Sequence, residues 1–317
     1  MFYLQYGIAL FCLMLLYIFI AKRFNIVDVP NLRSSHNHII VRGAGIVFPF
    51  SLIAYTITFS QYYPHFIYVF AGAMLISFIS FVDDIKSLPV YVRLPIHIIS
   101  VLMLMHGFSV FENWPIWVSV SLLFIMLGII NAYNFMDGIN GMTALYSLIS
   151  FCSFWYVIKY TEHMESTAFV NYGIVSCLVF LFFNFRKRAI CFLGDVGSIG
   201  LGFWTVAALG YIIFLQHHFE YILFLSVYGI DTGYTILERL KKRENIFNPH
   251  RQHLYQRLAN EGKHSHLVIA TIYAAVQLLV NSIVVFTDWN IIITTLVIIT
   301  PLSIVYFLLK RKYLCFS

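Results

Sequence analysis

Apolar stretches of about 18–22 residues recur along this chain, and they constrain its fold more than any other feature. Each is long enough to cross a bilayer as an α-helix, because a helix rises about 1.5 Å per residue and the hydrocarbon core is about 30 Å thick. Of the 317 residues, 60% are hydrophobic and only 11% are charged, whereas a soluble domain carries about 25% charged residues. The sequence therefore predicts an all-α, polytopic integral membrane protein.

We expect about eleven membrane-spanning helices in a single domain, 1–317. The predicted spans are 2–21, 44–62, 65–82, 91–108, 114–132, 142–160, 168–185, 198–216, 218–237, 266–287 and 290–309. The first apolar stretch is followed by Lys22 and Arg23, and it lacks both a basic segment before it and a small-residue cleavage site. We therefore interpret it as a retained span and not as a cleaved signal peptide.

The distribution of Lys and Arg predicts the orientation. With the N-terminus outside and the C-terminus cytoplasmic, nineteen of the twenty basic residues fall on the cytoplasmic side, and only Lys159 falls outside, as the positive-inside rule requires. This distribution also explains the net charge of +6 without a nucleic-acid partner. The five predicted cytoplasmic loops are 22–43, 83–90, 133–141, 186–197 and 238–265. Because they gather Asp, Asn, His, Arg and Gly on one face of a bilayer, we expect a site there.

Some classes of site are not indicated. The five cysteines lie mostly in apolar runs and no two are close in sequence, so neither a disulfide framework nor a cysteine metal site is predicted. The chain also contains no GxxxxGK[ST] phosphate loop and no HExxH zinc motif.

The pair Asp83 and Asp84, in FVDDIKSLP (81–89), closes the third predicted span. Carboxylates hold Mg²⁺, and Mg²⁺ holds diphosphate, so the pair indicates metal or phosphate chemistry. Neighbouring residues on a helix point about 100° apart, so we expect the two acids to have different roles. The alternative is a pair of interfacial acids beside Lys86.

The segment NAYNFMDGING (131–141) offers the amides of Asn131, Asn134 and Asn140 and the carboxylate of Asp137. Such groups suit recognition of a nucleobase or sugar edge by directed hydrogen bonds, and the glycines allow close approach of backbone to a ligand. We therefore expect Asp137 to be catalytic and the amides to bind substrate. The alternative is a turn between two helices.

The segment FLGDVGS (192–198) lies where the eighth predicted span begins. Free backbone N–H groups at a helix start favour an anion, so Gly194 is predicted to bind substrate. A carboxylate among such donors suits a cation shared with phosphates, which makes Asp195 the candidate metal ligand. The alternative is that Asp195 is only the N-cap of the following helix.

The segment HRQHLYQRL (250–258) lies in the longest loop. His250 and His253 are three residues apart, with Arg251 between them, which fits contacts to phosphate and sugar. We expect the two histidines to be catalytic and Arg251 to bind substrate. The alternative is a basic loop facing lipid head groups. Asp231, inside the ninth predicted span, is either part of a site or paired with a buried polar group on a neighbouring helix.

In this order, segments 30–45, 81–86, 131–141, 192–202 and 250–258 resemble the polyprenyl-phosphate N-acetylhexosamine-1-phosphate transferase superfamily, or glycosyltransferase family four. The resemblance covers nearly the whole chain and includes the related phospho-MurNAc-pentapeptide transferase. It implies that Asp83 and Asp84 handle the lipid phosphate and catalysis. It also implies that Asp195 binds Mg²⁺, for which Mn²⁺ can substitute.

The resemblance further implies a nucleotide-sugar site that contains Asn131 and Asp137, with Phe192 stacked on uracil. His250 and His253 would lie near the sugar and the diphosphate. The chain departs from the superfamily in two places. Asn140 replaces the second Asp of an Asp-Gly-x-Asp-Gly motif, which removes a negative charge, and HNHIIVRGAG (36–45) lacks two prolines and has Ala44 in place of a glycine.

The implied reaction transfers N-acetylhexosamine-1-phosphate from a UDP-sugar to undecaprenyl phosphate and releases UMP. It would start an O-antigen or a related cell-envelope glycan at the cytoplasmic face of a bacterial inner membrane. Two alternatives stay open: the phospho-MurNAc-pentapeptide transferase of peptidoglycan synthesis, and a non-enzymatic transporter or flippase. The sequence also leaves open which N-acetylhexosamine is used and whether the chain forms a homodimer.

Overall fold

The computed structural model describes residues 1–28, 39–59, 66–162, 166–216, 218–245 and 250–314. Part of the first polar loop (29–38, which includes the start of HNHIIVRGAG) and a short piece of the longest loop (246–249) lie outside the described residues.

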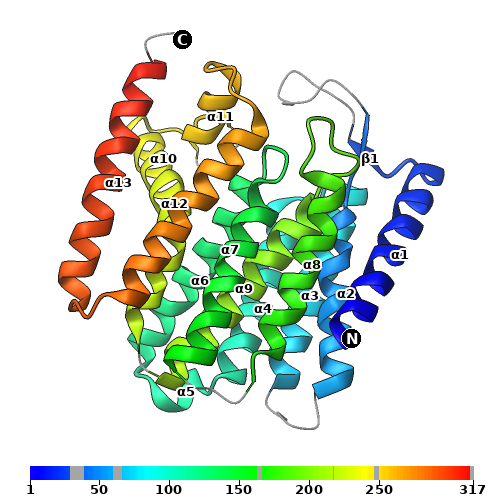
Figure 1. The fold of residues 1–317 in the computed structure, drawn as a ribbon, viewed down its shortest axis with the longest axis horizontal. Helices are drawn as coiled ribbons and strands as arrows, with labels where there is room; N and C mark the ends of the chain where they lie inside the picture. Colours follow the sequence, from blue (N-terminus) through cyan, green and yellow to red (C-terminus); the bar gives the residue numbers. More distant parts are fainter. Residues whose placement is uncertain (29–38, 60–65, 163–165, 217, 246–249, 315–317) are drawn as a thin grey trace.

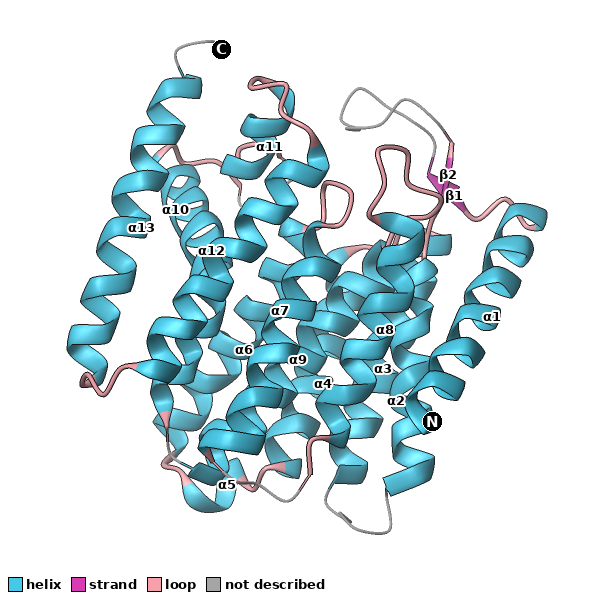
Figure 2. Cartoon of the chain, viewed as in Figure 1, coloured by secondary structure: helices cyan, strands magenta, loops and turns pink. Residues whose placement is uncertain are grey.

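The described chain is almost entirely helical (Figure 2). Its α-helices are α1 (Phe2–Arg23), α2 (Val47–Phe59), α3 (Phe66–Ile85), α4 (Val90–Gly107), α5 (Val110–Asn113), α6 (Ile116–Met136), α7 (Met142–Tyr156), α8 (Ala168–Asn184), α9 (Gly194–Gln216), α10 (Ser226–Lys241), α11 (Leu254–Asn260), α12 (His266–Phe286) and α13 (Ile291–Leu314). Short turns of other helix types precede or follow some of them: η1 (Ala44–Ile46), η3 (Val157–Thr161) and η4 (Phe219–Leu225). Strands β1 (Val27–Asp28) and β2 (Ile40–Val41) form one small antiparallel pair.

The prediction of an all-α polytopic membrane protein is confirmed. Within the described residues, eight helices are long and apolar enough to cross a membrane, and the stretches Ala44–Phe59 and Ala168–Asn184 are shorter apolar helices. Every predicted span overlaps a helix, but the ninth, 218–237, is divided between η4 and α10. The count of eleven crossings and their orientation stay predictions.

Helix α9 lies at the centre of the bundle and is almost completely buried. It packs against α3, α6 and α7, and its fully buried Trp204 contacts Phe151 of α7 with ring centroids 5.5 Å apart. Helices α1 and α13 lie at opposite edges of the bundle (Figure 1) and expose long apolar side chains such as Phe19 and Leu308. Such side chains suit a helix that faces lipid.

The polar segments gather at one end of the bundle. In Figure 1, strand β1, helix α11, the loop after α6 and the loop after α8 all lie at the upper end, whereas α5 lies at the lower end. Segments far apart in the sequence therefore meet at one end of the bundle, as the predicted order of membrane spans requires.

Candidate active site

The backbone of the first polar loop pairs with the segment that precedes α9. The N–H of Phe192 donates to the carbonyl of Val41 (2.7 Å), and the N–H of Ala44 donates to the carbonyl of Phe192 (3.1 Å). The N–H of Gly45 donates to the carbonyl of Leu193 (2.9 Å). A Cβ on Gly45 would lie only 2.2 Å from the Cα of Gly197, so glycine is required for this approach. These contacts hold both loops in one scaffold, in which the Phe192 side chain is half-buried.

The carboxylate of Asp84, at the end of α3, caps the N-terminus of α9. It accepts hydrogen bonds from the backbone N–H groups of Asp195 (2.8 Å) and Val196 (3.0 Å). From sequence we expect these N–H groups to face an anionic ligand, but here Asp84 fills that place. Gly194 has φ +72°, and a Cβ there would lie 2.4 Å from Asp84 Oδ2. The glycine is thus required by both its backbone conformation and its close contact with Asp84.

Two arginines form ion pairs with three acids, Asp83, Asp84 and Asp195. Arg42 Nε lies 2.8 Å from Asp84 Oδ1, and its Nη2 lies 3.3 Å from Asp195 Oδ1. Arg93 Nη1 lies 2.7 Å from Asp83 Oδ2 and 3.2 Å from Asp195 Oδ2. We call these five residues the acid–arginine cluster. Sequence reasoning used both arginines only to set the orientation, although the position of Arg42 in the glycine-containing RGAG segment could have signalled a role.

The adjacent acids of the pair have different partners. Asp83 accepts a hydrogen bond from the backbone N–H of Leu88 and pairs with Arg93, whereas the fully buried Asp84 side chain binds the start of α9 and Arg42. Asp84 therefore holds helices together, while Asp83 and Asp195, with side chains 8% and 17% exposed, are the more accessible acids.

The carboxylates of the cluster fit a magnesium site in which the substrate supplies some of the ligands. No group of three His, Cys, Asp or Glu side chains among the described residues forms a ready-made metal cage. Mg²⁺ is usually bound by one or two carboxylates together with phosphate oxygens and water. Asp195 offers a partly accessible carboxylate whose contacts with Arg42 and Arg93 are long, at 3.3 and 3.2 Å. It is therefore the carboxylate of the cluster that a cation could engage with least disruption.

A cavity of about 260 Å³ opens beside the cluster, and because five of its ten lining side chains are polar we call it the polar cavity. Its lining comes from α4, α6, α9, α10 and the start of the 250–258 segment: Val90, Arg93, Leu94, His97, Asn131, Asn134, Phe135, Ile199, Ile236 and His250. The structure thus brings together three residues that the sequence singles out, Asn131, Asn134 and His250. Arg93 belongs to both the cluster and the cavity.

His97 is a cavity residue that sequence reasoning missed. Its side chain is buried, with a 5% exposed fraction, and its Nε2 has no hydrogen-bond partner among the described residues. A buried polar atom without a partner is unusual in a native structure, and a polar ligand in the cavity would satisfy it.

The 131–141 segment, which comprises the end of α6 and the loop that follows, contains three amides with different partners. Asn134 Nδ2 donates to Ser198 Oγ (3.1 Å), and Asn131 Nδ2 donates to the carbonyl of Leu127 (2.8 Å). Buried Asn140 donates through Nδ2 to the carbonyl of Arg186 (2.8 Å). A carboxylate could not donate this bond, which explains why an amide suits position 140.

Asp137 follows the C-terminus of α6 and faces the same region. Its burial, together with the nearby charges of Asp195 and Asp84, raises the pKa of its carboxyl to about 7. A carboxyl with a pKa near neutrality is typical of a functional site.

The 250–258 segment lies over the end of α6. His253 is buried, and its ring stacks on that of Phe135 with centroids 6.1 Å apart. Burial and the proximity of His253 and Arg239 lower the pKa of His250 to about 4, so the imidazole of His250 is neutral at pH 7. Arg251 is half-buried and its Nη2 has no hydrogen-bond partner among the described residues.

The fold and this site define a polytopic helical membrane protein with an acid–arginine cluster and a polar cavity at one end of the bundle. The profile of glycosyl transferase family 4 matches residues 66–227, about half of the chain. The chain belongs to this family.

Curated relatives agree with this assignment. Undecaprenyl-phosphate alpha-N-acetylglucosaminyl 1-phosphate transferase of Escherichia coli (strain K12) is 26% identical, over 91% of this chain and 84% of its own length. A probable undecaprenyl-phosphate N-acetylglucosaminyl 1-phosphate transferase of Bacillus subtilis (strain 168) is 26% identical, over 80% of this chain and 75% of its own. Phospho-N-acetylmuramoyl-pentapeptide-transferase of Listeria monocytogenes serotype 4b is 33% identical, over 38% of this chain and 36% of its own.

Proposed function

We propose that this chain is a phosphosugar transferase that moves N-acetylhexosamine-1-phosphate from a UDP-sugar to undecaprenyl phosphate. The products are UMP and a lipid-linked sugar that starts an O-antigen or related envelope glycan. The observation that carries the proposal is the acid–arginine cluster beside a polar cavity, in a membrane protein of glycosyl transferase family 4.

The extent of the similarities favours this reaction over the peptidoglycan alternative. The Escherichia coli relative, named as an N-acetylglucosaminyl 1-phosphate transferase, aligns with 91% of the chain. The pentapeptide transferase of Listeria monocytogenes aligns with only 38%. We therefore propose an N-acetylhexosamine as the transferred sugar.

The position of the polar groups favours a transferase over a transporter. A carrier places its substrate site near the middle of the membrane and opens it to each side in turn. Here the cluster and the polar cavity are built mainly from residues of α3, α4, α6 and α9 and of the polar loops. These loops lie at one end of the bundle (Figure 2). A reaction between a water-soluble nucleotide sugar and a lipid fits such a place, and we propose that it faces the cytoplasm.

In the proposed reaction, an oxygen of the lipid phosphate attacks the sugar-side phosphorus of the diphosphate. The bond from that phosphorus to the bridging oxygen breaks, and UMP leaves with the electron pair. The sugar's anomeric bond is not broken. Phosphoryl transfer of this kind depends mostly on positioning and on neutralisation of charge.

The residues of the acid–arginine cluster can supply both positioning and neutralisation of charge. Arg93 links the acids to the cavity, so its guanidinium can hold a phosphate oxygen while Asp83 orients the guanidinium. The second pKa of a phosphate monoester is about 6, so the lipid phosphate is already largely ionised and Asp83 need not act as a strict base. Asp195 would hold Mg²⁺, or Mn²⁺ in its place, which when bound neutralises charge on the diphosphate.

An apolar cavity supports a lipid substrate. It has a volume of about 370 Å³ and lies between α6, the η4–α10 segment and α13, with Ile125, Ile129, Ile222 and Ile299 in its lining. Its apolar walls suit an isoprenoid chain that enters from the bilayer, and we propose that the acceptor's tail lies there.

The test uses the full chain in membranes or mild detergent with Mg²⁺, undecaprenyl phosphate and a panel of labelled UDP-N-acetylhexosamines. The proposal predicts that UMP release and transfer of label to the lipid phase occur together for one sugar and stop with EDTA. A reaction with UDP-MurNAc-pentapeptide alone would favour the peptidoglycan alternative. If folded protein neither released UMP nor bound any UDP-sugar, the transferase proposal would be wrong.

A further inference from the structure

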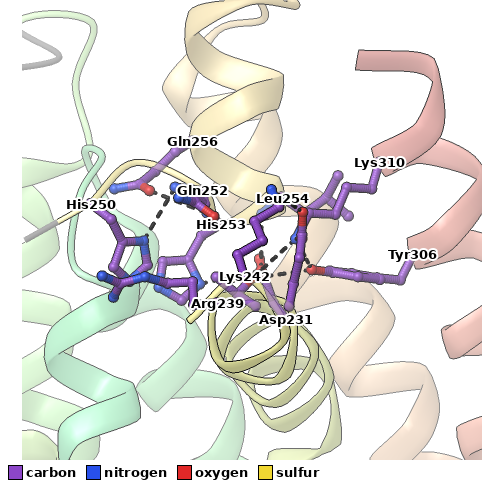
Figure 3. A network of polar contacts seen from close by, with 12 residues as sticks. Asp231, Arg239, Lys242, His250, Gln252, His253, Leu254, Gln256, Tyr306 and Lys310 are labelled. Carbon is purple, nitrogen blue, oxygen red and sulfur yellow. Dashed lines mark hydrogen bonds and ion pairs between the residues drawn. The ribbon is translucent and has the colours of Figure 1, made fainter. Parts of the chain in front are cut away.

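A further buried carboxylate, Asp231 of α10, lies outside the acid–arginine cluster and has no part in the proposed chemistry. It is 2% exposed. Its oxygens accept hydrogen bonds from the backbone N–H groups of Leu254 (2.9 Å) and Tyr255 (3.3 Å) and from the hydroxyl of Tyr273 on α12 (2.7 Å). Figure 3 shows Asp231 among these polar contacts between α10 and the 250–258 segment. A buried charge needs such hydrogen-bond donors. Because the donors come from α11 and α12, the Asp231 carboxylate joins three helices, α10, α11 and α12.

Asp231 caps helix α11 from another helix. Leu254 and Tyr255 are the first two residues of α11, where backbone N–H groups have no partner inside the helix. The N-cap residue, His253, places its Nδ1 3.4 Å from Asp231 Oδ1. A helix of seven residues is too short to be stable by itself, so its position depends on contacts of this kind.

Helix α11 in turn contacts the loop after α6. The hydroxyl of Tyr255 donates to the carbonyl of Phe135 (2.9 Å), and the ring of His253 stacks on that of Phe135 at an interplanar angle of 28°. A Cβ on Gly138 would lie 2.2 Å from the Tyr255 hydroxyl, so the helix and the loop are in close contact. Helix α11 and its N-cap residue therefore lie directly against Phe135 at the end of α6 and against the loop that follows.

The same helix start borders the polar cavity. The ring of His250 lies against that of His253, with centroids 4.9 Å apart and planes inclined by 33°. His250 and Phe135 both line the cavity. Asp231 is thus connected by contacts through His253 and Tyr255 to two residues of the cavity wall, His250 and Phe135.

We infer that Asp231 is a positioning residue. It holds the N-terminus of α11, and through His253 and Tyr255 it sets the place of His250 and Phe135 in the cavity wall. Its effect on turnover rests on the proposed function, whereas its effect on α11 does not.

Helix α10 also provides a matched control. Glu238, two turns beyond Asp231, pairs with Lys310 of α13 (2.6 Å) and with Lys242 (2.9 Å). Neither contact involves Asp231 or the start of α11. Glu238→Gln therefore removes a charge and two ion pairs from the same helix without removing a donor to Asp231.

The experiment compares the full-length wild type with Asp231→Ala, Asp231→Asn and Glu238→Gln. Two quantities are measured: kcat and KM for the UDP-sugar, and amide hydrogen exchange of the peptide that contains 254–258. For Asp231→Ala we expect kcat to fall about 100-fold, the scale of a misplaced site, with faster exchange in that peptide. Asp231→Asn retains one acceptor oxygen, so both effects are smaller. Glu238→Gln keeps the wild-type kcat and exchange.

A double variant separates positioning from general stability. If Asp231 acts through Tyr255, adding Tyr255→Phe to Asp231→Ala costs less than the product of the two single losses, because coupled residues are not additive. Wild-type kcat in Asp231→Ala, unchanged exchange in 254–258, or fully multiplicative losses would each overturn the inference. If Asp231→Ala does not fold, Asp231→Asn decides between the same outcomes. If the wild type transfers no sugar while exchange rises in the Asp231 variants, the proposed function fails and the role of Asp231 in holding α11 stands.

Discussion

Replacement of Asp84 tests whether the two adjacent acids have the separate roles that their contacts indicate. Asp84→Ala removes the acceptor for two backbone N–H groups of α9 and the 2.8 Å ion pair with Arg42. Breaking a buried ion pair by removing one partner costs about 3–5 kcal/mol. The Arg42 side chain is 32% exposed and keeps its contact with Asp195 at 3.3 Å, so water and Asp195 partly compensate its charge. We therefore expect the lower end of this range, about 3 kcal/mol, most of it from the two N–H groups, which cost about 1–3 kcal/mol each when unsatisfied.

The comparison variant is Asp195→Asn. The Asp195 side chain makes two long contacts with Arg42 and Arg93, at 3.3 and 3.2 Å, and a hydrogen bond with Asp83. The amide of Asn retains one acceptor and gains a donor for Asp83, so we expect a loss within about 1 kcal/mol. Both variants are unfolded reversibly in mixed detergent micelles, and their free energies of unfolding are compared with the wild type. Asp84→Asn should fall between them. A wild-type free energy of unfolding for Asp84→Ala would refute the capping role, since no other acceptor for these N–H groups is seen in the described residues.

Three further predictions follow from particular contacts. Gly194→Ala should destabilise the protein by about 1–2 kcal/mol from its left-handed backbone alone, and wild-type stability would contradict the assigned conformation. Burial raises the pKa of Asp137 to about 7 in the folded protein, whereas an Asp carboxyl in the unfolded chain loses its proton near pH 4. The free energy of unfolding should therefore fall as the pH rises from about 4 through 7. Asp137→Asn should make this dependence on pH weaker, and an unchanged dependence would contradict the raised pKa. Arg93→Lys keeps the charge, but the lysine ammonium lies one bond nearer to the backbone than Nη1, the atom that contacts both Asp83 and Asp195, and it has no second nitrogen in a planar fork for a phosphate oxygen. We expect kcat to fall about tenfold or more, and an unchanged kcat would remove Arg93 from the site.

The membrane fold could be predicted closely because its signals are local. Hydropathy runs and flanking charges are read within about 20 residues, and the predicted spans 91–108 and 266–287 agree with α4 and α12 to within one residue at each end. The predicted span 218–237 is divided between η4 and α10, and α10 carries acids that contact α11 and α13, which hydropathy alone does not predict.

The candidate site could be predicted only in part. The motifs identified the acids and amides, but pairing depends on contacts between distant segments. Asp84 receives its N–H groups from residues more than a hundred positions away, so its capping role has no local signature. Arg42 and Arg93 look like ordinary flanking charges until the fold brings them to Asp195. For Asp231 the sequence left two readings open, and the structure shows the pairing with a neighbouring element.

The most direct test of the central claim is turnover by Asp195→Asn in the coupled assay for UMP and lipid-linked label, alongside its free energy of unfolding. If Asp195 holds the cation that the diphosphate needs, both products disappear at all Mg²⁺ concentrations while the protein stays as stable as the wild type to within about 1 kcal/mol. Near-normal release of UMP by this variant would contradict the account, because the acid–arginine cluster would then not be the centre of the reaction.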